Sequence, residues 1–173
     1  NSAAYHAQID LQTNMTTLVS ILESDLRKIG YCRDFTKIPE PNKAVLLADS
    51  NRIKFLCDYN NDSVVDTIFY YVGPTTELLD TPNPRDRFLY KQINSGSPFK
   101  MNLGITTFDF KYFDALGDTV TFPVSDPRVV YSMAVSVQVE TPDPYEKKYV
   151  NDPYAYETFW RQIRLVSRNL QNR

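Results

Sequence analysis

Residues 2–30 read SAAYHAQIDLQTNMTTLVSILESDLRKIG and contain no proline and no glycine before Gly30. The apolar residues recur at helical spacing, which places them on one face of an α-helix. They are Leu11, Met15, Leu18, Leu22, Leu26 and Ile29. Gly30 favours the left-handed backbone that ends many helices. We therefore predict a helix over residues 1–30, about 40 Å long at ~1.5 Å per residue, around which the rest of the chain is organised.

The first turns of this helix differ from the rest because they carry no clear apolar stripe. Tyr5, His6 and Ile9 lie in these turns, and we predict that they contact neighbouring subunits. Since the chain begins abruptly at Asn1, we also expect the segment to be the lower half of a longer helix whose start has been removed.

After Gly30 the spacing changes to the alternation that is typical of strands. Strands are expected at residues 44–48, 52–59, 64–72, 87–93, 105–114, 129–140 and 156–170. The periodicity of 159–166 also fits a helix, but a hairpin with the preceding strand favours a strand. We predict a single domain over residues 1–173, with the helix at 1–30 and the sheet and loops at 31–173. The fold class expected is α+β, with a long N-terminal helix packed on an antiparallel sheet of about seven strands.

Composition and motifs argue against several functions. A net charge of −2 and a pI near 5.4 leave no basic footprint for nucleic acid. The sequence has no G-x-S-x-G, P-loop or glycine-rich dinucleotide turn, and its one histidine lies on the predicted helix. We predict that the protein is no enzyme and has no small-molecule substrate, although its 21 acidic residues leave a paired-acid glycosidase open.

Oxygen-bearing residues occur at alternate positions around a predicted turn. They are Asp58, Asn60, Asp62 and Asp66, with the backbone carbonyl of Val64 among them. Calcium prefers several such ligands at about 2.3–2.6 Å. The pattern departs from a standard calcium loop, because Ser63 replaces the usual glycine and Phe69 replaces the bidentate glutamate. Two hypotheses follow: a Ca²⁺ site completed by water or another residue, and a polar turn in which Asn and Asp suit the backbone.

Two cysteines occur, Cys32 just after the helix and Cys57 in a predicted strand. A disulfide between them would stabilise the fold by roughly 3 kcal/mol by constraining the unfolded chain. The alternative is a pair of buried free thiols.

Three stretches together resemble the type IV pilin superfamily, and within it the PilW-like minor pilins and the GspJ-like minor pseudopilins. LVSILESDLRKIGY (residues 18–31) is similar to the end of the pilin helix, where an acidic-Leu-Arg element precedes Gly-Tyr. IKFLCDYNNDSVVDTIFYY (residues 53–71) is similar to the acidic hairpin of these proteins. The chain then ends, as they do, in a valine-rich strand, a proline-containing loop and a last strand.

The resemblance implies a structural subunit of a type IV pilus or a type II secretion filament, which assembles with other minor and major pilins or pseudopilins. Such a subunit is processed by prepilin-type N-terminal methylation. It is anchored in the bacterial inner membrane by the missing half-helix, faces the periplasm and then enters the filament.

The alternative function is a calcium-dependent adhesion or binding module at a pilus tip or cell surface. It would use the aromatic residues Tyr145, Tyr149 and Tyr154 of a proline-rich loop. Stiff loops with tyrosine suit binding because they lose little conformational entropy on contact.

Overall fold

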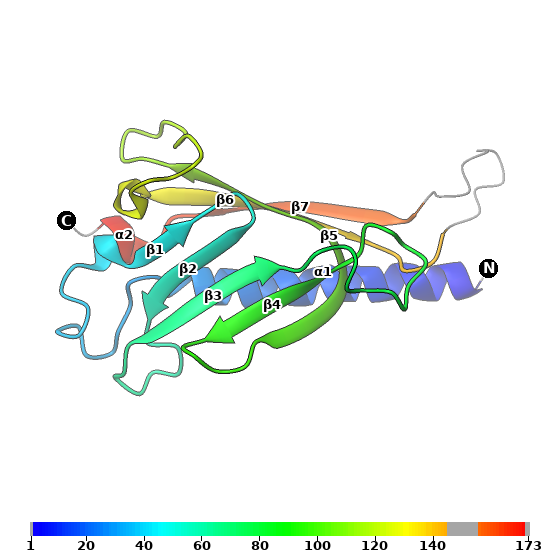
Figure 1. The fold of residues 1–173 in the computed structure, drawn as a ribbon, viewed down its shortest axis with the longest axis horizontal. Helices are drawn as coiled ribbons and strands as arrows, with labels where there is room; N and C mark the ends of the chain where they lie inside the picture. Colours follow the sequence, from blue (N-terminus) through cyan, green and yellow to red (C-terminus); the bar gives the residue numbers. More distant parts are fainter. Residues whose placement is uncertain (1, 145–155, 172–173) are drawn as a thin grey trace.

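Seven antiparallel strands form one sheet in which each strand pairs with its neighbours in chain order (Figure 1). The computed structural model describes residues 2–144 and 156–171. The strands are β1 (Val45–Ala48), β2 (Arg52–Cys57), β3 (Asp66–Val72), β4 (Arg87–Ile93), β5 (Phe99–Phe113), β6 (Ser132–Glu140) and β7 (Thr158–Leu165). The helices are α1 (Ser2–Arg27), η1 (Pro41–Lys43), η2 (Pro127–Val129) and α2 (Arg168–Gln171).

Alternating apolar residues explain why these segments pair as strands. In β2, Ile53, Phe55 and Cys57 are at most 1% exposed, whereas the residues between them are not buried. Phe55 faces Ile68 of β3, which is also fully buried. One face of the sheet therefore forms the core, and the other meets solvent.

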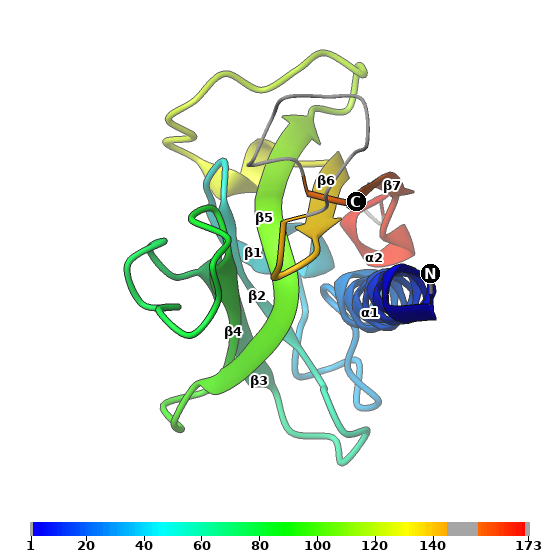
Figure 2. The same ribbon diagram turned by 90° about the vertical axis from the view of Figure 1, so that its right-hand side faces the viewer.

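The sheet curls because β5 changes partners along its 15 residues. Its first part pairs with β4 and its second part with β6, with register shifts near Ile105. Gly104 lies at this bend with a φ of 70°, which glycine adopts without strain. The β1–β2 turn returns to β5, where the Phe110 amide donates to the Ser50 carbonyl at 2.7 Å. The result is a half-barrel, seen end-on in Figure 2 with β5 as its long curved strand.

Helix α1 covers the open side of this half-barrel (Figure 2). The predicted apolar stripe, from Leu11 to Ile29, is at most 5% exposed and packs against β5, β6 and β7. The C-terminal segment holds the end of the helix, because Ser167 and Asn169 donate side-chain hydrogen bonds to the Ile29 carbonyl at 3.0 and 3.1 Å.

The prediction of an α+β fold organised by a long N-terminal helix was wrong. The structure is mostly sheet, a curled seven-stranded half-barrel with one short helix against it. The helix also ends at Arg27, before the predicted Gly30. Gly30 donates its N–H to Leu56 of β2 at 2.9 Å, so the chain has already left the helix to join the sheet. No helix in the described residues is long and apolar enough to cross a membrane.

A buried ion pair ties the helix to the sheet. Asp25 of α1 and Lys91 of β4 are 5% and 8% exposed, and the Lys91 Nζ lies 2.6 Å from the Asp25 carboxylate. The Tyr70 hydroxyl donates to the same oxygen. Burial and the Asp25 charge raise the pKa of Tyr70, which therefore stays a neutral donor. The Lys91 ammonium also lies 4.4 Å from the centre of the Tyr59 ring, a cation–π distance.

Candidate functional site

The acidic residues of the predicted calcium loop lie close together between β2 and β3. One carboxylate oxygen each of Asp58, Asp62 and Asp66 lies within 4.8 Å of the others. The Asn60 amide donates to Asp62 at 2.9 Å, and the Val64 N–H donates to it at 2.8 Å. The structure thus brings the three aspartates together, and Asn60 and Val64 are hydrogen-bonded to Asp62.

Backbone N–H groups already hold Asp58, whose side chain is 1% exposed. It accepts hydrogen bonds from Arg33, Asp62 and Ser63 at 2.9–3.1 Å. Burial alone would raise the pKa of Asp58, but these N–H groups outweigh it and hold that pKa below the usual range. Ser63 has a φ of 70° and so takes the left-handed conformation of the glycine it replaces. Three carboxylates here could hold a hard cation, with water completing its shell, although the loop's own hydrogen bonds also account for its shape.

Cys32 and Cys57 are both buried free thiols, so the predicted disulfide is not formed in this structure. The two side chains have different surroundings: the Cys32 thiol donates to Asp58 at 3.8 Å, and Cys57 belongs to the apolar core. Burial raises the pKa of both thiols, that of Cys57 to about 12. Neither is ionised near neutral pH, so neither is an activated nucleophile.

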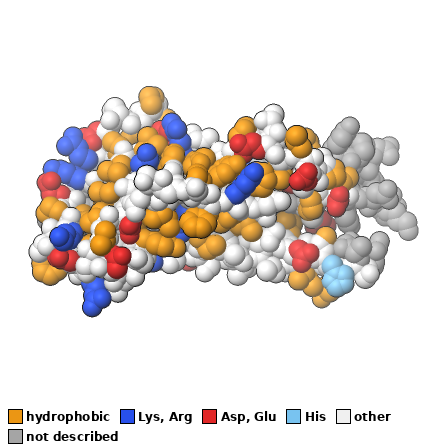
Figure 3. Space-filling view, turned by 60° about the horizontal axis from the view of Figure 1, so that its bottom comes forward, with side chains coloured by type: hydrophobic (Ala, Val, Ile, Leu, Met, Phe, Trp, Pro, Cys, Tyr) orange, Lys and Arg blue, Asp and Glu red, His pale blue; other side chains and the backbone are white. Residues whose placement is uncertain are grey.

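The predicted contact residues lie on an uncovered part of α1. Tyr5 is 64% exposed, Ile9 is 41% exposed, and His6 is also exposed. Tyr5 and Ile9 are four residues apart, so they share one side of the helix. In Figure 3 the single histidine marks this end of the molecule, and hydrophobic atoms lie beside it. The apolar side of the helix is therefore buried only from Leu11 onward.

A cavity of about 490 Å³ lies beside these turns. His6, Asp10 and Asn14 of α1 line one wall, and Asp86 and Glu140 belong to the opposite one. Neither Asp86 nor Glu140 was expected to matter from the sequence. Both are buried, at 1% and 4% exposed.

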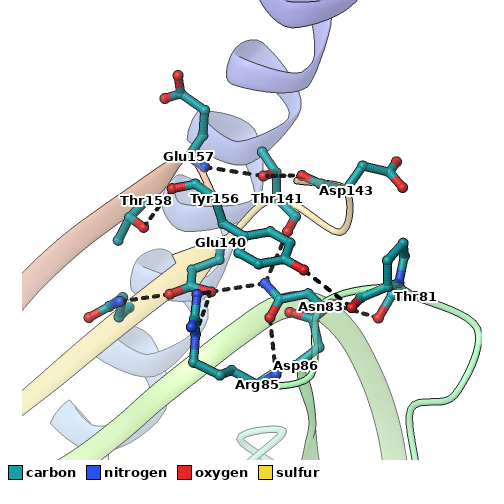
Figure 4. Close-up of polar contacts among 12 residues, drawn as sticks. Thr81, Asn83, Arg85, Asp86, Glu140, Thr141, Asp143, Tyr156, Glu157 and Thr158 are labelled. Carbon is teal, nitrogen blue, oxygen red and sulfur yellow. Dashed lines mark hydrogen bonds and ion pairs between the residues drawn. The ribbon is translucent and has the colours of Figure 1, made fainter. Parts of the chain in front are cut away.

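A hydrogen-bonded network fastens the 73–86 loop to the end of β6 (Figure 4). The Glu140 carboxylate accepts from Asn83 at 2.9 Å and from two nitrogens of Arg85 at 2.9 and 3.1 Å. The Arg85 guanidinium also lies 5.2 Å from the centre of the Tyr156 ring. The Tyr156 hydroxyl donates to the Pro82 carbonyl at 3.2 Å. Glu140 is therefore ion-paired with Arg85.

Asp86 is the member of this network without an ionic partner. One oxygen accepts from the Thr81 hydroxyl at 3.0 Å, and the other is buried with no hydrogen bond. Burial, helped by the Glu140 charge, raises the pKa of Asp86 to about 6. The cavity thus has an acidic wall and suits a cationic group.

Replacing Asp86 with asparagine should raise the free energy of unfolding at pH 7 by about 1–2 kcal/mol. The folded-state pKa of about 6 lies above the ordinary value of 3.8, so the folded protein binds the extra proton. Stability from this group is therefore present below about pH 4 and is lost as the pH rises through about 6. Urea unfolding of Asp86→Asn and of the exposed control Asp80→Asn, from pH 4 to 8, measures this effect. A loss of stability at pH 7 in Asp86→Asn would contradict it.

Sequence reasoning missed this network because its members are far apart in the chain. Asn83 and Arg85 meet Glu140 across 57 and 55 residues, and no local spacing encodes that meeting. The one available signal in the sequence was Glu140, a charged residue at the end of a valine-rich strand. The aromatic loop residues Tyr145, Tyr149 and Tyr154 lie outside the described residues.

Among the described residues, no serine, threonine or cysteine is hydrogen-bonded to His6, the single histidine of the chain. Comparison with protein-family models, curated proteins and solved structures gives no match. The exposed helix start, the acidic cavity and the aspartate loop are therefore the features of the molecule that indicate a function.

Proposed function

We propose that this protein is a structural subunit, a minor pilin or minor pseudopilin, of a filament of the bacterial cell envelope, either a type IV pilus or a type II secretion pseudopilus. It works by assembly with other pilins or pseudopilins. The observation that carries the proposal is the helix start: Tyr5 and Ile9 stay exposed on a helix whose apolar stripe is buried from Leu11 onward. Tyr5 and Ile9 lie on one side of the helix end, where they offer a partner an apolar contact.

The surroundings of the helix start favour partners with a basic surface. Asp10 and Asp86 line the adjacent cavity together with Glu140, and only Glu140 has an arginine partner. A lysine or arginine from a neighbouring subunit would compensate the remaining charge. In the proposed filament the subunit waits in the inner membrane, facing the periplasm, before it is incorporated.

Site-specific photocrosslinking in the native host tests this proposal. A photoreactive residue at Tyr5 or Ile9 of the full-length protein should crosslink to pilin-like proteins. The matched control is Leu116, which is 87% exposed and lies on a distant loop. Crosslinks to pilins only from Leu116, or none from Tyr5 and Ile9, would reject assembly through the helix start.

A second candidate function, calcium-dependent adhesion, is favoured by one observation, the clustering of Asp58, Asp62 and Asp66. If this function is correct, Ca²⁺ added to chelator-treated protein should release or absorb heat and raise the melting temperature. Asp62→Asn should abolish both effects because it removes a charged ligand and leaves the buried Asp58 in place. A titration with neither heat nor a melting shift would remove this candidate.

A further inference from the structure

Two adjoining cavities lie where the β1–β2 turn meets the curled part of the sheet. The smaller, of about 300 Å³, is lined by Arg87 of β4 and by residues 105–109 of β5. The larger, of about 700 Å³, is lined by the β1–β2 turn, β3 and Phe122. Asn51 and Val72 line both cavities, so the two adjoin. Neither touches the helix start on which the proposed function rests.

Two buried donors in the smaller cavity have no partner. They are the Arg87 Nε and the Thr106 hydroxyl. In the described part of the chain, the Arg87 side chain makes no hydrogen bond or ion pair. Thr106 is the extra residue of a β-bulge, because Ile105 and Thr107 pair with consecutive residues of β6. Bulges of this kind often turn a side chain toward a binding site.

Unpaired buried donors cost stability, so both call for an acceptor in the same cavity. A carboxylate suits Arg87 best, since the guanidinium fork binds its two oxygens side by side. Asp109 lines the same cavity and Asp49 lines the adjoining one. Asp49 is paired with Arg52, which lines the same cavity, so within the described residues Asp109 is the acid of the two that no arginine or lysine compensates. Its charge disfavours a chain of closely spaced phosphates, so a ligand with a single carboxylate fits better than a nucleic acid.

The larger cavity supplies an aromatic wall. Phe69 and Tyr71 have ring centres 4.7 Å apart, and Tyr71 stacks on Tyr90 at 4.9 Å with an angle of 10°. Phe122 is 40% exposed at the same cavity. Rings held by one another lose little entropy on contact and suit the apolar face of a sugar ring. The polar turn residues Ser50 and Asn51 lie beside them, where they can bond hydroxyl groups.

We propose that these adjoining cavities bind a carboxylated saccharide, with its carboxylate on Arg87 and Thr106 and its neighbouring sugar on the Phe69, Tyr71 and Phe122 wall. The hydroxyl groups of the sugar bond the β1–β2 turn. This gives the protein a glycan-binding activity in addition to the proposed assembly function.

Titration of the protein with aldotriouronic acid, a trisaccharide that carries a single glucuronic acid carboxylate on xylobiose, followed by calorimetry or by amide shifts in NMR spectra, tests the proposal. Binding should weaken at least tenfold in Arg87→Gln and in Thr106→Val, and in both variants the melting temperature should not fall. The control Arg161→Gln, an exposed change in β7, should bind as the wild type does. The neutral trisaccharide xylotriose should bind at least tenfold more weakly than aldotriouronic acid.

Several outcomes would overturn the proposal. Equal binding by Arg87→Gln and wild type, or equal binding of the neutral trisaccharide, would remove the carboxylate contact. Tighter binding of a single-stranded oligonucleotide would assign the surface to nucleic acid instead. The absence of binding to aldotriouronic acid, glucuronic acid and N-acetylneuraminic acid at millimolar concentration would reject the saccharide site and leave the Arg87 and Thr106 donors to water alone.

Discussion

Replacing Lys91 with methionine should lower the free energy of unfolding by about 3–5 kcal/mol, because it leaves the Asp25 carboxylate buried without a cation. The two groups are 2.6 Å apart, and the pair joins α1 to β4. Methionine keeps most of the volume of the lysine stem, so the loss reports the charge and little of the packing. Urea unfolding followed by circular dichroism measures the effect.

The double variant Asp25→Leu, Lys91→Met is the control for this experiment. Removing both charges should recover most of the loss, since a buried ion pair often contributes little compared with an apolar pair of similar volume. The Tyr70 hydroxyl loses its acceptor in the double variant, so a deficit of about 1 kcal/mol should remain. A loss below about 1 kcal/mol in the single variant would show that the Asp25 charge has another compensation.

Gly104→Ala should lower the free energy of unfolding by about 2–4 kcal/mol. The added Cβ would lie 2.5 Å from the backbone oxygen of Glu140, and the φ of 70° is strained for any L-residue. Backbone at the centre of a curled sheet cannot yield without disturbing the pairing of β5 with both neighbours.

The variant Gly117→Ala separates the effect of the close Cβ contact from that of the strained backbone conformation. Gly117 also has a positive φ, of 88°, but a Cβ there would meet nothing within 4 Å. The free energy of unfolding of Gly117→Ala should fall by about 1–2 kcal/mol, from the backbone conformation alone. Equal losses at the two glycines would contradict the close contact on which the curl of β5 depends.

The sequence predicted the local structure better than the proportions of helix and sheet in the fold. The stripe from Leu11 to Ile29 indicated a helix and its buried face, because both follow from spacing along one element. The predicted fold class nevertheless overestimated the contribution of the helix, because a strong local pattern contains no information about the size of the sheet beside it. Strand β5 begins at Phe99, before the predicted start at residue 105, because Gly104 lies at a bend within the strand and does not precede it.

The candidate sites also differ in how far local spacing in the sequence could predict them. Asp58, Asp62 and Asp66 are neighbours in the chain, so their spacing was enough to predict that they would meet. Glu140 and Asp86 are brought together by sheet topology, and so are Arg87 and Thr106. Such pairs can be found only once the curl of the sheet is known.

Photocrosslinking from Ile9 in assembling cells tests the central claim of a filament subunit most directly. We predict crosslinks between the Ile9 position, 41% exposed at the uncovered helix start, and other pilin-like subunits, with none from the control at Leu116. Crosslinks from Ile9 only to the same polypeptide chain would contradict the claim, because the helix start would then be covered within the subunit.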